Sequence, residues 1–371
     1  MDMNEPLVSQ AGRLLAVLPR IASRAEALDA APGLLPIEDV EDLSAVGLLL
    51  APFPASLGGS GWSGAASFDA LRLVGRASLS LGRLYEGHVN AVRLILRHGT
   101  ANQRQAASSD AQEGRLFGVW NTESPTVSLR IENGMLRGGK ILCSGAGLVE
   151  RALVTVQHSA PDGSGQQLLV VPLPRGTPRA DLSRWIPTGM RASATGTINL
   201  DDIAVTPAML LGGRDAYQTQ PDFSTGAWRF LAVQLGGVEA LAEALRQHLV
   251  CTQRGSDPHQ AARLGSAIAA AETARLWVRS AAQMTEQAGA DPDQVIAYVN
   301  LARGVVERAA LDVMEAANRS VGLQAFMQTN PLERMVRDLS TYLRQPGPDA
   351  ALVKGAAAIL TSMDPVGEIW R

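Results

Sequence analysis

The stretch RWIPTGMRASATGTINLDDIAV, residues 184–205, carries the most specific structural signal in the chain. Two glycines, Gly189 and Gly196, stand where the backbone would turn between strands. The runs TGTINL and IAV that follow have the composition of short β-strands. Arg191 and Ser193 fall on the loop between the two glycines. We expect most of these residues to pack, so the stretch predicts a fold rather than a reaction.

A zone of short β-prone runs surrounds this stretch, from Leu116 to about Leu211. Runs such as LFGVW, RALVTVQ and QLLVVPL alternate with turn residues. The dipeptide Asn133-Gly134 is a strong signal for a two-residue hairpin turn. We therefore predict a small antiparallel, barrel-like β domain over residues 115–212.

Helical periodicity dominates on both sides of the β zone. Residues 1–114 predict an N-terminal α-helical domain, which a glycine-rich loop at 57–64 interrupts and a short polar helix ends. Residues 213–371 hold four alanine-rich segments of bundle length, with proline only at their edges. These four segments are residues 227–249, 260–284, 295–321 and 332–345. The predicted fold is mainly α with a central β domain and a C-terminal four-helix bundle.

The bulk composition excludes several classes of protein. Hydrophobic residues make up 46% and charged residues 19%, which is typical of a globular chain. A net charge of −3 gives no support to a nucleic-acid or anionic-membrane partner. The two cysteines, Cys143 and Cys251, are far apart, which argues against a disulfide framework or a CxxC metal site. The apolar run 46–53 is too short to span a bilayer. We expect a soluble, cytoplasmic protein without a metal centre.

Five segments, in the correct order along the chain, resemble the acyl-CoA dehydrogenase superfamily. Residues 184–205 resemble its W-x-x-x-G-M-R block at nearly every landmark. The other four are PFPASLGGSG (52–61), GVWNTESP with GGKILCSGAG (118–125 and 138–147), CTQRGSDPHQAARLG (251–265) and NRSVGLQAFMQTNPLERMVRDL (318–339). The resemblance implies this superfamily's fold, with an N-terminal helical domain, a β domain and a four-helix bundle, and it implies FAD as cofactor.

The resemblance also assigns contacts with the flavin ring. Trp120, Asn121 and Thr122 fall in the loop that holds the isoalloxazine, with Thr122 facing its pyrimidine side. Ser144 stands where the family has a threonine that bonds near flavin N5, a place that needs a small neutral donor. The structural alternative for this segment is a β-hairpin with a polar edge. The chain departs from the family in a shortened SPTVSLR loop, where a G-S-D sequence usually helps to hold the pyrophosphate.

A second set of implied contacts lies in the bundle. Arg254 matches an arginine that holds the FAD pyrophosphate of a neighbouring subunit, and a planar guanidinium suits that grip. Gln260 is a further candidate, and Asn318 and Gly322 fall on a turn that approaches the dinucleotide from the partner subunit. The resemblance therefore implies a homodimer or homotetramer. The alternative for Arg254 is a solvated loop residue.

The family's catalytic glutamate is missing from both of its usual places. In acyl-CoA dehydrogenases this base removes the α-proton of a thioester while a hydride passes to flavin N5. Counting eight residues from Asp338 reaches Pro346, and the other family position, before Gly236-Gly237, is Phe230. Neither residue is a carboxylate.

Two residues are candidates to replace the lost base. Asp349 is the nearest carboxylate after the proline pair, although Asp in a P-D-A-A-L run is also typical of a helix N-terminus. His88 lies in the helical zone that flanks the substrate pocket in this fold, from which the related dibenzothiophene monooxygenase-like enzymes use a histidine. With Asn121 and Ser144 it would supply a proton-handling set. The alternative is a histidine held by a neighbour such as Tyr85.

Three functions follow from these features. The first is an FAD-dependent dehydrogenase that oxidises an acyl thioester, such as an acyl-CoA, or a related activated substrate by hydride transfer to N5, with an electron-transfer partner. The second is a monooxygenase that takes reduced flavin from a separate reductase and reacts it with O2. The third is a non-catalytic flavin-bound homologue of the kind that binds DNA, for which the net charge gives no support. We place the dehydrogenase narrowly first, with a small-molecule substrate and neither nucleic acid nor membrane as partner.

Overall fold

The chain forms two compact units. The computed structural model describes residues 5–31, 33–125, 128–160, 163–344 and 347–370. The first unit comprises Met1–Trp62, Arg83–Ile186 and Arg191–Thr219, and the second comprises Ser63–Gly82, Pro187–Met190 and Gln220–Arg371. The first unit therefore groups the β zone with most of the N-terminal helices. The three-domain division at residues 114 and 212 stays a prediction.

The helices of the first unit begin and end at recognisable signals. They are α1 (Glu5–Ala30), α2 (Ile37–Ala45), most of α4 (Leu79–His98) and α5 (Ala101–Gln112). A capping box between Thr100 and Gln103 starts α5, because each side chain bonds the backbone N–H of the other residue. This confirms the short polar helix that the sequence predicts at the end of the N-terminal zone.

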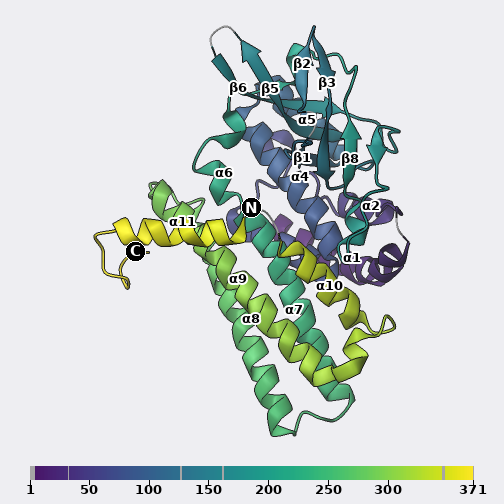
Figure 1. The fold of residues 1–371 in the computed structure, drawn as a ribbon, viewed down its shortest axis with the longest axis vertical. Coiled ribbons are helices and arrows are strands. Elements are labelled where there is room, and N and C mark those ends of the chain that lie inside the picture. Colours follow the sequence, from purple (N-terminus) through teal and green to yellow (C-terminus); the bar gives the residue numbers. More distant parts are fainter. Residues whose placement is uncertain (1–4, 32, 126–127, 161–162, 345–346, 371) are drawn as a thin grey trace. The chain divides into compact units, whose positions relative to one another are not determined.

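Strands fill the middle of the chain, and their pairing is mixed. The strands are β1 (Phe117–Trp120), β2 (Arg130–Glu132), β3 (Met135–Arg137), β4 (Gly139–Cys143), β5 (Arg151–Ala160), β6 (Gly163–Pro172), β7 (Ala180–Asp181), β8 (Gly196–Asn199) and β9 (Leu210–Leu211) (Figure 1). One sheet has the order β3-β2-β5-β6-β9 with β1 beside β5, and the other has the order β4-β8-β7. Most pairs are antiparallel, as predicted, but β1 and β2 run parallel to β5. A parallel neighbour needs a long return connection, and β2 to β4 supply it between β1 and β5.

The predicted hairpin is confirmed. Asn133 and Gly134 connect β2 to β3 with φ values of 51° and 75°, so both central residues are left-handed, as a type I′ turn requires. The fold class is confirmed as well, since helical segments stand before and after a central sheet domain.

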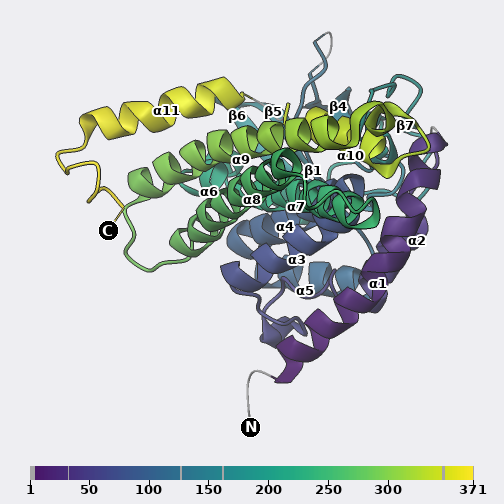
Figure 2. The same ribbon diagram turned by 90° about the horizontal axis from the view of Figure 1, so that it is seen from below.

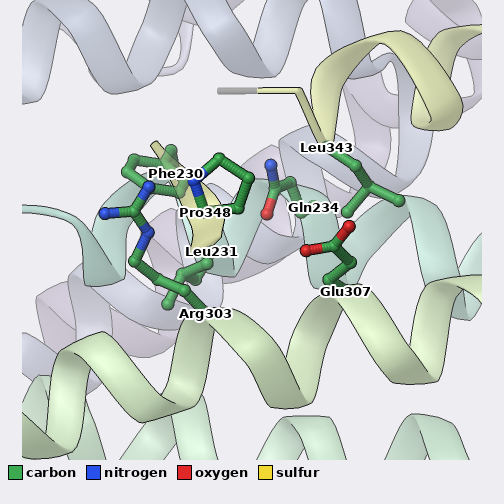
Figure 3. A pocket seen from close by; sticks show the side chains of 7 residues that line it. All are labelled: Phe230, Leu231, Gln234, Arg303, Glu307, Leu343 and Pro348. Atoms are coloured by element: carbon green, nitrogen blue, oxygen red, sulfur yellow. The ribbon is translucent and has the colours of Figure 1, made fainter. Parts of the chain in front are cut away.

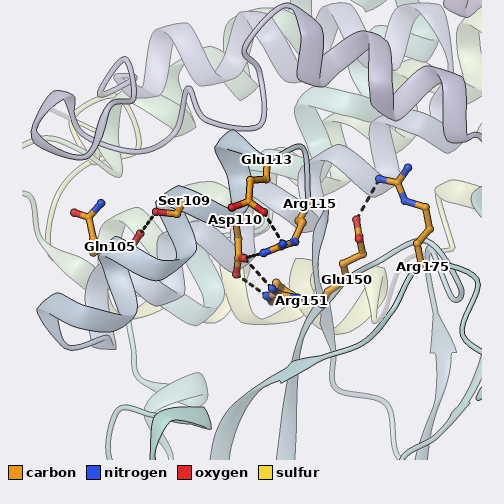
Figure 4. A network of polar contacts seen from close by, with 8 residues as sticks. All are labelled: Gln105, Ser109, Asp110, Glu113, Arg115, Glu150, Arg151 and Arg175. Atoms are coloured by element: carbon orange, nitrogen blue, oxygen red, sulfur yellow. Dashed lines mark hydrogen bonds and ion pairs between the residues drawn. The ribbon is translucent and has the colours of Figure 1, made fainter.

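An ion-pair network fixes α5 to β5 (Figure 4). Arg151 bonds Asp110 with two nitrogens, Nε to Oδ2 at 2.5 Å and Nη2 to Oδ1 at 2.8 Å. Arg115 contacts the same carboxylate. A bidentate guanidinium–carboxylate pair restricts orientation as well as distance. The network therefore holds β5, the strand that carries part of the candidate site.

Long helices make up the second unit. They are α3 (Gly64–Ala77), α6 (Asp222–Thr225), α7 (Trp228–Cys251), α8 (Pro258–Met284), α9 (Pro292–Val321), α10 (Pro331–Tyr342) and α11 (Pro348–Thr361). Figure 2 shows α7, α8 and α9 packed along one another, which agrees with their many mutual contacts. The four predicted bundle helices are thus confirmed as α7 to α10. Asp257, Asp291 and Asn330 cap α8, α9 and α10, each followed by a proline at the first helical position.

None of the helices in the described part of the chain is both long and apolar enough to cross a bilayer.

Two glycines let α3 and α7 approach closely. A Cβ added at Gly236 of α7 would collide with the backbone of α3 at Arg72 and Arg76, and one at Gly75 would collide with the backbone of Val233. Hydrogen in place of a side chain is therefore a packing requirement at this crossing.

We expect Gly236→Ala to lower the free energy of unfolding by about 3 kcal/mol, because the added methyl group has no space between two helix backbones. The matched control is Gly265→Ala on α8, where an added Cβ meets nothing within 4 Å. That variant should be neutral or more stable by up to about 1 kcal/mol. Thermal and denaturant unfolding of both variants checks this, and equal stability of the two would contradict the close crossing.

Candidate functional site

Ser144, directly after β4, is the centre of a polar group in the first unit. Its hydroxyl oxygen accepts hydrogen bonds from Arg83 Nε at 3.2 Å and from Thr195 Oγ1 at 3.2 Å. Thr195 is in turn 2.8 Å from the hydroxyl of Ser193. A serine hydroxyl has two acceptor positions and one proton to donate. Because both acceptor positions of the Ser144 hydroxyl are filled, its proton is available to donate a hydrogen bond to a ligand.

Two residues near this serine have a strained backbone. Leu142 and Ala194 have φ values of 54° and 45°, a region that residues with a side chain rarely adopt. The pairing of β4 with β8 shifts register between Lys140 and Cys143, and the Leu142 side chain is 57% exposed. Strained non-glycine residues gather at functional sites, where the surrounding structure holds them. The strain therefore supports a functional role for the segment around Ser144.

The other three predicted ring contacts lie in the same group. Trp120 Nε1 donates to the Ser144 backbone oxygen at 2.9 Å, and the Trp120 ring is buried. The Trp120 side chain therefore holds the end of β4 in place and has little exposed surface for a ligand. The Asn121 side-chain oxygen accepts from the Thr155 hydroxyl, which leaves the amide NH2 as a donor. Thr122 is exposed, and its carbonyl accepts from Ile141 N at 3.1 Å.

A buried lysine underlies this group. The Lys140 side chain is 0% exposed, and its ammonium donates to Glu123 and, at 3.2 Å, to Thr155 Oγ1. Burial lowers the pKa of Lys140, and the Glu123 carboxylate opposes that shift. The chain Lys140–Thr155–Asn121 therefore sets the orientation of the Asn121 amide. Sequence reasoning missed Lys140, since one lysine in a five-residue strand does not reveal which face is buried.

Helix α4 adds a second set of charges that the sequence did not single out. Glu86 is 1% exposed, and its carboxylate accepts from Arg83 and from Asn90. These residues lie three and four positions apart and so share one side of the helix. Their spacing was visible in the sequence, but charges at such spacing more often form surface pairs.

His88, on the same helix, is fully buried with both ring nitrogens in use. Nε2 lies 2.8 Å from the Leu49 carbonyl, and Nδ1 accepts from the Phe117 backbone N–H at 3.2 Å. Burial lowers the pKa of His88 to about 4, which keeps the ring neutral. The ring also stacks on Tyr85. This geometry leaves no ring nitrogen for a ligand and favours the packing alternative, with backbone groups rather than Tyr85 as the hydrogen-bond partners.

The bundle residues predicted to contact a dinucleotide are linked in the second unit. Arg254 Nη1 donates to the Ser320 carbonyl at 3.3 Å. Asp257 connects Arg254 to Gln260, because its N–H donates to the Arg254 carbonyl and its carboxylate accepts from Gln260 N. Gly322 ends α9 with a φ of 74°.

Several side-chain atoms in this linked group lack a partner. Gln260 Oε1, Asn318 Oδ1 and Ser320 Oγ are buried without a hydrogen-bond partner among the described residues. Gln260 and Ser320 are only 3% and 2% exposed. Because a buried unsatisfied polar atom costs about 1–3 kcal/mol, such atoms are typical of sites completed by a ligand or water.

The second unit also has a small open hollow (Figure 3). Its lining residues are Phe230, Leu231, Gln234, Arg303, Glu307, Leu343 and Pro348. Phe230, one of the two expected base positions, lies 5.5 Å from the Arg303 guanidinium, measured to the ring centre. Pro346, the other position, lies outside the described residues, although Pro348 lines the hollow.

Two carboxylates that could serve as a base, Asp349 and Glu307, lie in different surroundings. Asp349 is exposed in the first turn of α11, which is the helix start that the sequence offered as its alternative role. Glu307, which sequence reasoning missed, lines the hollow and is ion-paired with Arg344. Only the packing of α7, α9 and α11 reveals it, because Glu307 lies in none of the five family-like segments.

The buried neutral His88 predicts a pH dependence of stability. Its folded pKa, about 4, lies below the unfolded value of 6.5, so the unfolded chain binds the proton more readily. The contribution of the neutral His88 to the free energy of unfolding is fully present above pH 6.5. It is lost as the pH falls toward 4, by about 3 kcal/mol in total. We expect His88→Gln to remove this slope, and His259→Gln, at an exposed position, to keep it. Urea unfolding between pH 4 and 7 measures both slopes.

Comparisons with known proteins identify the family. Residues 17–114 match the family model described as acyl-CoA dehydrogenase, N-terminal domain, and residues 215–357 match acyl-CoA dehydrogenase, C-terminal domain. The chain is 28% identical to L-evernosamine nitrososynthase from a Micromonospora species, over 91% of this chain and 87% of that protein. It is 24% identical to dibenzothiophene monooxygenase from Mycolicibacterium goodii, over 82% of each.

A solved structure agrees with this assignment at the level of the fold. The crystal structure of TdsC from Paenibacillus sp. A11-2 with FMN and indole superposes with a TM-score of 0.85 at 19% identity, covering 98% of this chain and 100% of that chain. The two family models match the regions before and after the central strands. Some of the five family-like segments lie within each matched region. The chain therefore belongs to the acyl-CoA dehydrogenase superfamily.

Proposed function

We propose that this chain is a flavin-dependent monooxygenase, which receives reduced flavin from a separate reductase and reacts it with O2. The observation that carries the proposal is Phe230 in the hollow of the second unit. By the resemblance, this is one of the two positions at which a dehydrogenase of this superfamily would present a carboxylate. Without a base of that kind, an α-proton is not removed and a hydride is not released to flavin N5. Reaction with O2 does not need that base.

The group around Ser144 suits a flavin ring. When bound, the flavin would supply the electrons that activate O2. The chain itself offers the Ser144 proton and the Asn121 amide as two donors, each fixed from behind by a further hydrogen bond. Donors held in one orientation bind a planar heterocycle without further ordering of the protein. This fit supports a flavin at the group around Ser144. The contact of each residue with the flavin is part of the proposal.

The relatives favour oxygenation of a small molecule. Their names denote a nitrososynthase and a dibenzothiophene monooxygenase, which act on a nitrogen and a sulfur compound. We therefore propose a small substrate with an electron-rich nitrogen or sulfur atom, in place of the acyl thioester that the superfamily alone would suggest.

The form of the flavin is a finer proposal. The resemblance implies FAD, while the similar TdsC structure contains FMN. The unpartnered atoms of Gln260 and Ser320 beside Arg254 support a ligand there, so we propose FAD, with its diphosphate at this group. A second copy of the chain would supply the rest of the FAD contacts, in a homodimer or homotetramer.

One observation favours the dehydrogenase as a second candidate. Glu307 lines the same hollow as Phe230 and would be a relocated base, although Arg344 holds it in an ion pair. Such an enzyme would need an electron-transfer partner instead of a reductase.

Rapid mixing separates the two functions. We expect the protein, loaded with reduced FAD and mixed with O2, to show a long-lived absorbance that differs from that of oxidised flavin. Oxidised protein mixed anaerobically with butyryl-CoA should keep its flavin colour. Bleaching in the second experiment that is lost in Glu307→Gln would instead establish the dehydrogenase.

Arg254→Ala tests where the diphosphate lies. We expect it to weaken FAD binding roughly tenfold, the effect of one hydrogen bond to a charged group, and to leave FMN binding unchanged. Arg319→Ala is the matched control, since Arg319 is an exposed arginine of α9 paired with Glu315. Fluorescence titration with both flavins provides the dissociation constants. An equal loss for FMN and FAD would show that Arg254 does not act on the second phosphate, which only FAD has.

A further inference from the structure

Arg83 presents a guanidinium at the group around Ser144. Its Nε donates to Ser144 Oγ at 3.2 Å, and its Nη1 donates to Glu86. The third nitrogen, Nη2, has no hydrogen-bond partner among the described residues, and the side chain is 24% exposed. One edge of the guanidinium is therefore fixed by protein, and the remaining donor is open to a ligand beside Ser144.

The buried Glu86 carboxylate holds the Arg83 guanidinium in position. Glu86 is 1% exposed and also accepts from Asn90, so its position is set by two donors of the same helix. An arginine that is paired in this way loses less conformational freedom when it binds a ligand. The charge also reaches Tyr217, because burial raises the pKa of that phenol and Arg83 opposes the shift. Arg83 therefore exerts an electric effect on groups beyond its direct contacts.

The other cation of this group is shielded from a ligand. Lys140 is 0% exposed and donates to Glu123, with Thr155 between it and Asn121. Among the described residues linked by contacts to Ser144, Arg83 is the cation with an accessible donor. A charge that acts on a ligand at this serine is therefore that of Arg83.

We propose that Arg83, held by Glu86, makes the site select reduced flavin over oxidised flavin. The inference rests on the proposed function, which places a flavin ring at Ser144. Oxidised isoalloxazine is neutral, whereas its two-electron reduced form carries a negative charge near neutral pH. Glu86 offsets part of the charge, but the Arg83 guanidinium and not the carboxylate contacts Ser144, so it stabilises the reduced form more than the oxidised form. Such selectivity lets an enzyme take reduced flavin from a reductase while oxidised flavin is released.

Anaerobic titration of the purified full chain tests this. The probes are FMN and FAD, each oxidised and dithionite-reduced, and the flavin that the wild type binds more tightly is used throughout. We expect the wild type to bind the reduced form more tightly. Arg83→Met should weaken reduced-flavin binding roughly tenfold more than oxidised-flavin binding, as for loss of one bond to a charged group. The midpoint potential of the bound flavin should fall accordingly, which is a readout independent of turnover.

Three further variants separate charge from packing. Arg83→Lys keeps the charge and should keep most of the preference for reduced flavin, and Arg83→Gln replaces Arg83→Met if the latter does not fold. Arg93→Met is the matched control, because Arg93 is an exposed arginine of the same helix and the variant makes the same change in net charge. It should leave the preference unchanged.

The possible failures are distinct. If Arg83→Met weakens both redox forms equally, or changes neither, the wild type still binds flavin and only the role of Arg83 is wrong. If the wild type binds neither form of FMN or FAD, the proposed function is wrong and the inference with it.

Discussion

The ammonium group of Lys140 is buried in the first unit, and the arrangement of the surrounding strands depends on keeping it paired there. Glu123 supplies the opposite charge and Thr155 a further acceptor. A buried cation without a partner would cost several kcal/mol, so β4, β5 and the segment that follows β1 must meet around it. The Asn121 amide is oriented through the same chain. One desolvated charge thus determines the positions of the groups that we assign to the flavin.

The second unit depends on a different constraint, the close crossing of α3 and α7. Gly75 and Gly236 remove the side chains that would keep the two backbones apart. Helices that approach so closely have little freedom to rotate, since packed interiors leave few voids. The position of Phe230, less than two turns before Gly236 on the same helix, is fixed by this crossing. The aromatic ring in the hollow is therefore a consequence of rigid packing.

These two features maintain the fold of the superfamily, whereas the chemistry that we propose depends on single side chains. The donors around Ser144 need only an ordered sheet end, which the fold provides in any case. Removal of a thioester proton needs one carboxylate at one place, and in our proposal Phe230 occupies that place. A fold tolerates such a change more easily than a change at a crossing glycine.

The sequence by itself determined the main helices, the central strand zone and the family. Asn133-Gly134 specified its turn because both residues tolerate positive φ, and the cap-then-proline pairs marked where α8 to α10 begin. These effects are local: they act within a few residues, so they can be predicted from the sequence alone. The five family-like segments, in the correct order along the chain, were likewise sufficient to place the chain in its superfamily.

Only the tertiary structure decided which polar side chains are buried and with what partners. His88 and Glu86 lie two positions apart on α4, yet one bonds backbone groups in the core and the other holds Arg83 beside Ser144. Lys140 and Glu307 depend in the same way on strands and helices distant in sequence. The physical reason is that the pKa and the hydrogen bonds of a charged group depend on its desolvation and its neighbours in space. Sequence spacing places a residue on its own element but does not specify what packs against that element.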